Sequence, residues 1–129
     1  MIGVVVVTHG QLAAELVSAA ETIVGDLPQM KAVSIGWHED VQDARQEIAS
    51  AIAAVSGSEG VIIATDMFGG TPANLGITFL ETGKIEVVTG VNLPMLIRAL
   101  TYRDEPLEDV VAKALSGGSE GVMRMPPTA

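Results

Sequence analysis

The feature that most constrains the fold is a short aliphatic run near the start of the sequence, which ends at a histidine. Residues 2–8 read Ile-Gly-Val-Val-Val-Val-Thr, and His9 follows directly, before a helical pattern that begins near Gln11. A β-branched run this short and uniform predicts a parallel strand buried on both faces of a sheet. The turn after such a strand lies at the carboxyl edge of the sheet, where open α/β folds bind their ligands. His9 is therefore the first candidate functional residue.

The rest of the chain alternates between strand and helix patterns. Apolar spacing predicts helices over 12–24, 41–55, 73–80, 92–100 and 107–115, strands over 31–35, 61–65 and 85–89, and a short last strand over 121–125. Asp40 is expected to cap the helix that ends near Gly57, and Gly117 with Gly118 is expected to end the last helix. The alternation predicts a single α/β domain over residues 1–129, with a mostly parallel open sheet and helices on both faces.

Composition narrows the class of function. The formal net charge of −9 disfavours nucleic acid and anionic membrane surfaces, which bind positive faces, and favours a basic protein partner. The absence of cysteine excludes disulfides, thiolate chemistry and cysteine-ligated metals. No apolar stretch reaches the roughly 18 residues of a membrane span, and no basic segment precedes an apolar one, so we expect a cytoplasmic protein.

Two turns at the active edge of the predicted sheet carry the candidate chemistry. One holds His9, and the other begins at Asp66, directly after the strand over 61–65. If those strands are neighbours, about 4.8 Å apart, the two side chains can meet. A carboxylate bonded to one ring nitrogen fixes the tautomer and leaves the lone pair of the other nitrogen outward, as a histidine nucleophile requires. This placement predicts a histidine that carries a phosphoryl group.

The double glycine of the second turn adds a place for phosphoryl oxygens. Gly69 and Gly70 let the backbone approach a ligand closely, and Thr71-Pro72 predicts an N-cap followed by a first helical residue. Gly10, beside the histidine, belongs to the same predicted phosphate site. Phosphoryl transfer spreads charge over three oxygens in a loose transition state, so positioned hydrogen-bond donors can supply most of the catalysis. No metal or cofactor is demanded.

Two segments with aromatic residues lie near these turns in the sequence. Phe68, with Met67, is expected to form an exposed apolar contact for a partner rather than to cover the core. His38, with Trp37, Glu39 and Asp40, forms a rival cluster. Adjacent side chains rarely converge on one ligand, so a solvated loop is the better interpretation of that cluster.

Three motifs, in order, resemble those of one known family. They are Val-Val-Thr-His-Gly over 6–10, Asp-Met-Phe-Gly-Gly-Thr-Pro-Ala-Asn over 66–74, and Gly-Val-Asn-Leu-Pro-Met-Leu over 90–96. Together they resemble the IIA component of the mannose family of the phosphoenolpyruvate-dependent sugar phosphotransferase system (PTS). The resemblance covers essentially the whole chain. It implies four parallel strands plus a final antiparallel strand, over 120–125, that is exchanged between the subunits of a homodimer.

The resemblance also implies an activity. His9 would take a phosphoryl group from the carrier protein HPr and pass it to a IIB component, which makes the chain a phosphotransferase with a phosphohistidine intermediate. Asp66 would orient the ring, while Thr71 and the Gly-Gly amides would line the phosphate site. Asn92 and Pro94, in the third motif, would border that site.

Two departures from the family pattern matter. The sequence ends at Ala129, where transport proteins of the family often continue through a linker into IIB. We therefore expect IIB on a separate chain, and contact with a membrane only peripherally, at a IIC or IID permease. Phe68 replaces a common Trp of the second motif, which is expected to alter partner contacts without changing the phosphate chemistry.

Three alternatives remain open from the sequence. One is a regulatory binding module whose partner choice depends on His9 phosphorylation, without sugar transport, because a phosphoryl group adds about two negative charges. Another is the phosphoryl-donor subunit of dihydroxyacetone kinase, although Gly10 and the segment 90–95 fit the mannose type better. A flavodoxin-like nucleotide binder is the third, weakened because no Gly-x-Gly-x-x-Gly or Walker pattern follows a strand.

Overall fold

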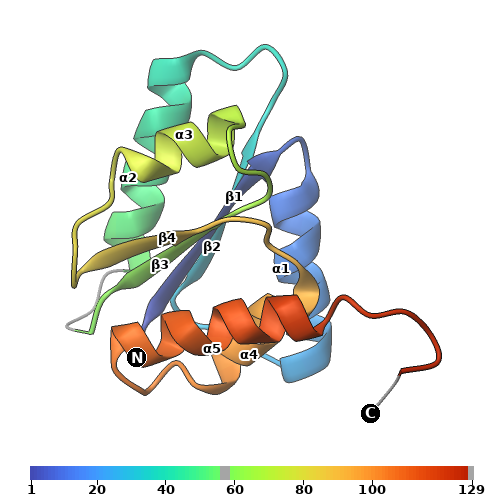
Figure 1. Cartoon of the computed structure of the whole chain (residues 1–129). Helices are drawn as coiled ribbons and strands as arrows, with labels where there is room; N and C mark the ends of the chain where they lie inside the picture. The colour runs from blue at the N-terminus through green and yellow to red at the C-terminus, as the bar shows by residue number, and fades with distance from the viewer. Residues whose placement is uncertain (56–58, 128–129) are drawn as a thin grey trace.

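The computed structural model describes residues 1–55 and 59–127. Within them, a four-stranded sheet lies between two layers of helices (Figure 1). The strands, in spatial order, are β2 (Met30–Ile35), β1 (Gly3–His9), β3 (Val61–Thr65) and β4 (Ile85–Val88). Every neighbouring pair is parallel, so all four carboxyl ends lie at one edge of the sheet. The predicted α/β fold is confirmed.

The helices cover both faces of the sheet, as predicted. They are α1 (Leu12–Val24), α2 (Val41–Val55), α3 (Thr71–Ile77), α4 (Leu93–Thr101) and α5 (Leu107–Glu120). Val4 and Val6 of β1 point into one apolar core, with α1, α4 and α5. Val5 and Val7 point into the other, with α2 and α3. Because successive side chains of a strand alternate between faces, the central strand must be aliphatic throughout.

The first residues of α2 and α3 can be compared with the predicted N-caps, Asp40 and Thr71. Asp40 caps α2, since its Oδ1 accepts the N–H of Gln42 at 2.8 Å, whereas the predicted end near Gly57 lies outside the described residues. The prediction for α3 was wrong by one residue. Gly70 is the N-cap, in an extended conformation, and Thr71 is already helical and makes no side-chain cap bond. The α-helix also ends at Ile77, earlier than predicted, because the next turn tightens to i→i−3 bonds.

The predicted end of α5 was also wrong, because the helix continues through Gly117 and Gly118 to Glu120. These glycines face α4. A Cβ on Gly117 would lie 2.6 Å from the Cβ of Arg98, and one on Gly118 would lie 3.1 Å from the Cε of Met95. The two residues are therefore glycine because α4 and α5 pack closely, and this packing outweighs their poor helix propensity.

The last strand, predicted over 121–125, is not formed within the single chain. Residues 121–127 carry no strand and extend away from the body of the fold (Figure 1). Val122 and Met125 are 77% and 71% exposed. A strand needs a neighbour for its backbone N–H and C=O groups, and none is present beside this segment. Exchange of the segment between two subunits stays a prediction.

A buried arginine closes the amino edge of the sheet. Arg103, only 6% exposed, donates from Nε and Nη2 to the carbonyl of Ile2 at 3.1 and 2.8 Å, and from Nη2 to that of Gln29 at 3.0 Å. Burial lowers the pKa of the guanidinium, against the opposing charge of Asp104. Since Ile2 and Gln29 directly precede β1 and β2, this side chain fixes where the two strands begin.

Candidate functional site

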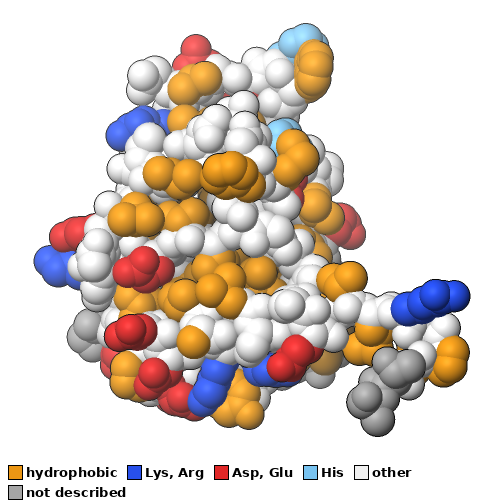
Figure 2. Space-filling view, in the orientation of Figure 1, with side chains coloured by type: hydrophobic (Ala, Val, Ile, Leu, Met, Phe, Trp, Pro, Cys, Tyr) orange, Lys and Arg blue, Asp and Glu red, His pale blue; other side chains and the backbone are white. Residues whose placement is uncertain are grey.

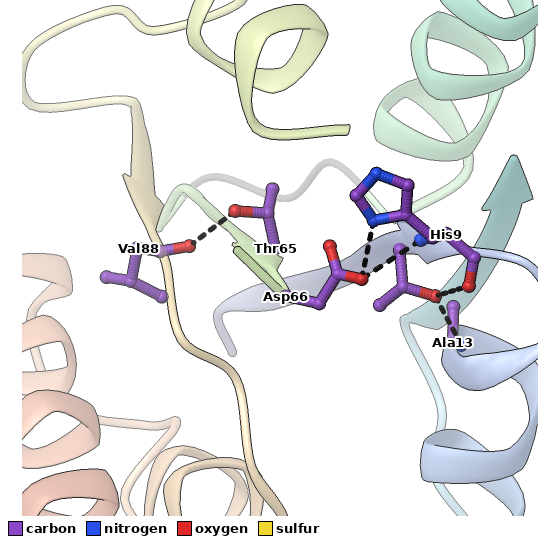
Figure 3. A network of polar contacts seen from close by, with 6 residues as sticks. His9, Ala13, Thr65, Asp66 and Val88 are labelled. Carbon is purple, nitrogen blue, oxygen red and sulfur yellow. Dashed lines mark hydrogen bonds and ion pairs between the residues drawn. The ribbon is translucent and has the colours of Figure 1, made fainter. Parts of the chain in front are cut away.

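His9 and Asp66 meet at the carboxyl edge of the sheet. His9 is the last residue of β1, and Asp66 directly follows β3, the strand beside it. Asp66 Oδ2 accepts the backbone N–H of His9 at 3.1 Å and lies 2.9 Å from its Nδ1 (Figure 3). The register explains the contact, because Val7 pairs with Thr65 in the neighbouring strand and His9 and Asp66 follow this pair by two residues and by one. The contact predicted from the sequence is therefore present.

The electrostatics of the pair fix the ring's tautomer. Partial burial raises the pKa of the Asp66 carboxyl, but hydrogen bonds from the ring and backbone of His9 outweigh it, and the pKa lies below its usual value. An ionised carboxylate can only accept hydrogen bonds, so Nδ1 of His9 carries the proton in this pair. In the neutral ring the lone pair is then on Nε2, the nitrogen that points away from Asp66 (Figure 3). The His9 side chain is 48% exposed, which leaves Nε2 open to a reactant.

Gly70 lies against the same ring. A Cβ built on Gly70 would be 2.7 Å from His9 Cε1 and 3.2 Å from Nε2. Any side chain at this position would therefore crowd the nucleophilic nitrogen. The N–H of Gly70 donates to the carbonyl of Met67 at 3.1 Å, and Gly69 has a φ of +85°, a conformation suited to glycine. The loop is shaped to bring a bare backbone up to the histidine.

The other predicted phosphate ligands lie around this loop and the β1–α1 turn. Gly10 has a φ of +54°, and its N–H donates to the carbonyl of Ile35 at 2.9 Å. The N–H groups of Gly10 and Gly70 are thus both given to backbone carbonyls, and these glycines shape the chain and leave space. The exposed Thr71 begins α3, and its hydroxyl has no hydrogen-bond partner among the described residues. Contact of these residues with a phosphoryl group stays a prediction.

Asn92 and Pro94 hold α4 against α5. Asn92 caps α4, with Oδ1 accepting the N–H of Met95 at 2.9 Å, while Nδ2 donates to the carbonyl of Gly118 at 3.0 Å. Pro94 packs so closely on the end of α5 that a Cβ on Gly121 would lie 2.5 Å from its Cγ. Within the described chain, neither side chain hydrogen-bonds to His9 or Asp66, and a role at the border of the site stays a prediction.

Thr8 is a residue of the site that the sequence analysis missed. Its fully buried hydroxyl accepts the N–H of Ala13 at 2.6 Å and donates to the carbonyl of His9 at 3.2 Å. It thereby ties the start of α1 to the end of β1, and uses one of the N–H groups in the first turn of that helix. The signal was a hydroxyl at the end of an otherwise aliphatic strand.

Neither a metal cluster nor a membrane-spanning helix accompanies the site in residues 1–55 and 59–127. In those ranges no three His, Asp or Glu side chains are grouped so that they could hold a metal ion. The helices there are all too short or too polar to cross a bilayer.

The comparison with known protein families agrees with this geometry. A family model named EIIA-man, described as "PTS system fructose IIA component", matches residues 3–115. The chain belongs to the EIIA-man family. The matched range includes His9, Asp66 and the glycine loop, and the resemblance inferred from the three motifs is confirmed.

Two curated relatives belong to the same system. This EIIA-man chain is 30% identical over 124 residues to the PTS system mannose-specific EIIAB component of Escherichia coli K12, a match that covers 94% of the chain and 38% of that protein. The chain thus spans little more than a third of that relative's length. It is also 30% identical over 120 residues to the PTS system fructose-specific EIIA component of Bacillus subtilis, covering 90% of the chain and 82% of the relative.

Solved structures of IIA proteins share the fold. The EIIA component from Streptococcus agalactiae superposes with a TM-score of 0.86 at 26% identity, covering 96% of this chain and 97% of that one. The mannose/sorbose-specific IIA subunit from Enterococcus faecalis gives the same TM-score, 0.86, at 24% identity, with coverages of 98% and 96%, which is evidence for the fold alone. The EIIA-man chain thus has the fold of these IIA proteins, as the resemblance implied.

Proposed function

We propose that this protein is a phosphohistidine carrier that accepts a phosphoryl group on Nε2 of His9 from HPr and passes it to a IIB component of a mannose-type PTS. The single observation that carries the proposal is the 2.9 Å contact between Asp66 Oδ2 and His9 Nδ1. This contact holds the proton on Nδ1 and directs the nucleophilic nitrogen away from the carboxylate (Figure 3). Membership of the EIIA-man family supports the choice of phosphoryl transfer over nucleotide binding.

The transfer step uses these groups directly. The Nε2 lone pair attacks phosphorus while the bond from phosphorus to the donor atom breaks, and that electron pair leaves with the donor. The ring keeps its Nδ1 proton and becomes cationic, and the ionised Asp66 carboxylate, which accepts hydrogen bonds from the ring and from the His9 backbone, stabilises the cation. The reverse sequence delivers the phosphoryl group to the next acceptor.

Space for the phosphoryl oxygens comes from the two turns. The missing Cβ of Gly70 leaves room beside Nε2, while Gly10 follows His9 in the chain and Gly69 and Thr71 adjoin Gly70. Charge on the three oxygens would be met by the Thr71 hydroxyl and by loop N–H groups that the backbone does not already use.

We further propose that the protein works as a homodimer in which the segment after α5 adds an antiparallel strand to the sheet of the partner. Two observations support this. β4 lies at the end of the strand order, where the described residues add to its outer side a bridge between Ile85 and Glu81 but no further strand, and Val122, Met123 and Met125 are exposed beyond α5. Light scattering of the whole chain, compared with a chain shortened after Gly121, tests it: we expect a dimer that becomes a monomer on truncation.

The carrier proposal is tested by labelling. Purified protein is incubated with phosphoenolpyruvate, enzyme I and HPr, and intact mass is measured before and after acid treatment. We expect one acid-labile phosphoryl group in the wild type and in His38→Ala, and none in His9→Ala. His38 is the matched control because the chain has only two histidines. An unmodified wild type, or a label that survives His9→Ala, would contradict the proposal.

A further inference from the structure

An exposed aromatic side chain lies on each flank of His9. Trp37 is 92% exposed and Phe68 is 80% exposed, the two highest values among the large hydrophobic side chains of the described residues. β2 pairs with β1 up to Ile35 opposite His9, so the turn that holds Trp37 leaves the sheet beside the histidine. On the other flank, Phe68 lies two residues after Asp66. The edge of the sheet therefore presents the nucleophile between two bare aromatic groups.

The turn that holds Trp37 is built to present it. The N–H of Glu39 donates to the carbonyl of Gly36 at 3.2 Å, and the N–H of Gly36 donates to Oε1 of Glu39 at 3.2 Å. These reciprocal bonds close a turn with Trp37 and His38 at its centre, and the two rings stack edge to face with centroids 6.2 Å apart. The indole buries almost nothing within the fold, so it contributes little to folding. Large aromatic side chains held in this way are typical of binding surfaces.

The position of His9 between the turns that hold Trp37 and Phe68 indicates which kind of protein would cover these two side chains. In the proposed function, the donor's phosphorus has to come within about 3–3.5 Å of His9 Nε2 before transfer. A protein that makes this approach necessarily lies over the turns that flank the histidine. Met67 and Leu12, 58% and 44% exposed, extend the apolar character of the edge, and both histidines lie beside hydrophobic side chains on the face shown in Figure 2.

The negative charge of the chain indicates the charge expected on the donor protein. The chain carries a formal net charge of −9, so a partner with a positive surface is attracted and oriented on approach. The partner that fits has an apolar patch beside its phosphoryl-bearing side chain and basic groups around that patch.

We propose that Trp37 and Phe68 form the docking surface for the phosphoryl donor protein, HPr, with Trp37 as a specificity-determining contact that lies outside the three sequence motifs. This inference rests on the proposed carrier function. Buried tryptophans are frequent among the few interface residues that account for most binding energy. Trp37 should therefore act on recognition of the donor and leave the chemistry at His9 unchanged.

The test compares two phosphoryl donors. Phosphorylation of Trp37→Ala is measured at increasing concentrations of phospho-HPr, and separately with phosphoramidate, a small donor that needs no docking surface and releases ammonia as Nε2 takes the phosphoryl group. With phospho-HPr we expect kcat/KM to fall by about tenfold to a hundredfold, mainly through KM. The rate with phosphoramidate should not change. Trp37→Phe should recover most of the loss.

Ile23→Ala is the matched control, since Ile23 is an exposed apolar residue, 57% accessible, in the last turn of α1. It should behave as the wild type with both donors. Wild-type kinetics of Trp37→Ala with phospho-HPr would overturn the docking inference and leave the carrier function standing. A loss that also appears with phosphoramidate, or one confined to the later transfer to IIB, would likewise overturn it. Failure of both donors to phosphorylate the wild type would instead overturn the carrier function.

Discussion

The two edges of the sheet use polar side chains in opposite ways. At the amino edge, Arg103 is 6% exposed and makes three hydrogen bonds to the backbone carbonyls that precede β1 and β2. At the carboxyl edge, the His9 side chain is 48% exposed and bonds through Nδ1 alone to Asp66. Both groups join neighbouring chain segments. Only the second leaves a reactive atom open, which is the difference between a structural link and a functional site.

This comparison predicts that substitutions at the two edges affect different quantities. At the carboxyl edge they should reduce the transfer rate and lower the free energy of unfolding less than substitutions at the amino edge do. At the amino edge they should reduce stability and leave the chemistry unchanged, because a buried group that is hydrogen-bonded to the backbone contributes to the fold and touches no reactant.

The largest effect is expected for Asp66→Asn. The amide can replace the shape of the carboxylate but not its charge, so it no longer stabilises the cationic ring, and an amide turned the other way selects the wrong tautomer. We expect transfer from phosphoramidate to slow by about a thousandfold, with an unchanged circular dichroism spectrum. A wild-type rate would remove the orienting role of Asp66 and with it the contrast between the edges.

Gly70→Ala should follow, with a loss of about a hundredfold in the same assay. The new methyl group would lie 2.7 Å from His9 Cε1, and the ring or the loop has to move. The φ of −77° at Gly70 is accessible to alanine, so stability should change little. Gly83→Ala is the matched control and should keep the wild-type rate: its Cβ meets nothing within 4 Å, its φ of +83° costs about 1 kcal/mol of stability, and it precedes β4 at the opposite edge of the sheet. Equal rates for Gly70→Ala and the wild type would contradict the close approach.

At the other edge, Arg103→Ala should lower the free energy of unfolding by about 2–4 kcal/mol, measured by urea denaturation. The substitution leaves the carbonyl of Ile2 without its side-chain donor inside a buried region. The phosphorylation rate of the folded variant should match that of the wild type. A reduced rate at unchanged stability would show that the amino edge is coupled to the site.

The sequence was sufficient to predict a residue's role where that role depends on the strand to which the residue belongs or which it follows. Aliphatic runs predicted β1 and β3, and the positions of His9 and Asp66 directly after them predicted the contact between the two side chains. Roles that depend on distant neighbours could not be predicted. Gly117 was predicted to end a helix, but it lies inside α5, where its missing side chain makes room for Arg98 of α4. The last strand was predicted over 121–125, where the described part of a single chain offers no neighbouring strand for the backbone to pair with.

At the site, too, contacts between residues far apart in the sequence could not be predicted, as the packing against the His9 imidazole shows. Gly70 was expected to bind phosphate through its backbone, but its N–H is used within the loop and its missing Cβ is what the ring requires. Trp37 was correctly expected in an exposed loop. The significance of that exposure depends on the parallel pairing that places Ile35 opposite His9, which no local pattern reveals.

The smallest expected effect is a shift in titration. In the wild type, NMR titration of the Asp66 carboxyl should give a pKa below the usual value of about 3.9. In His9→Ala the ring hydrogen bond is lost, while partial burial still raises the pKa, so the measured value should move upward.

A lowered pKa in the folded state means that ionised Asp66 stabilises the fold above its unfolded pKa, and that this contribution is lost as pH falls through the folded pKa. The stability difference between wild type and His9→Ala should therefore shrink below about pH 4, whereas the difference between wild type and Arg103→Ala should not follow this titration. If the Asp66 pKa were the same with and without the imidazole, the ring would not be the hydrogen-bond donor that the carboxyl-edge site requires.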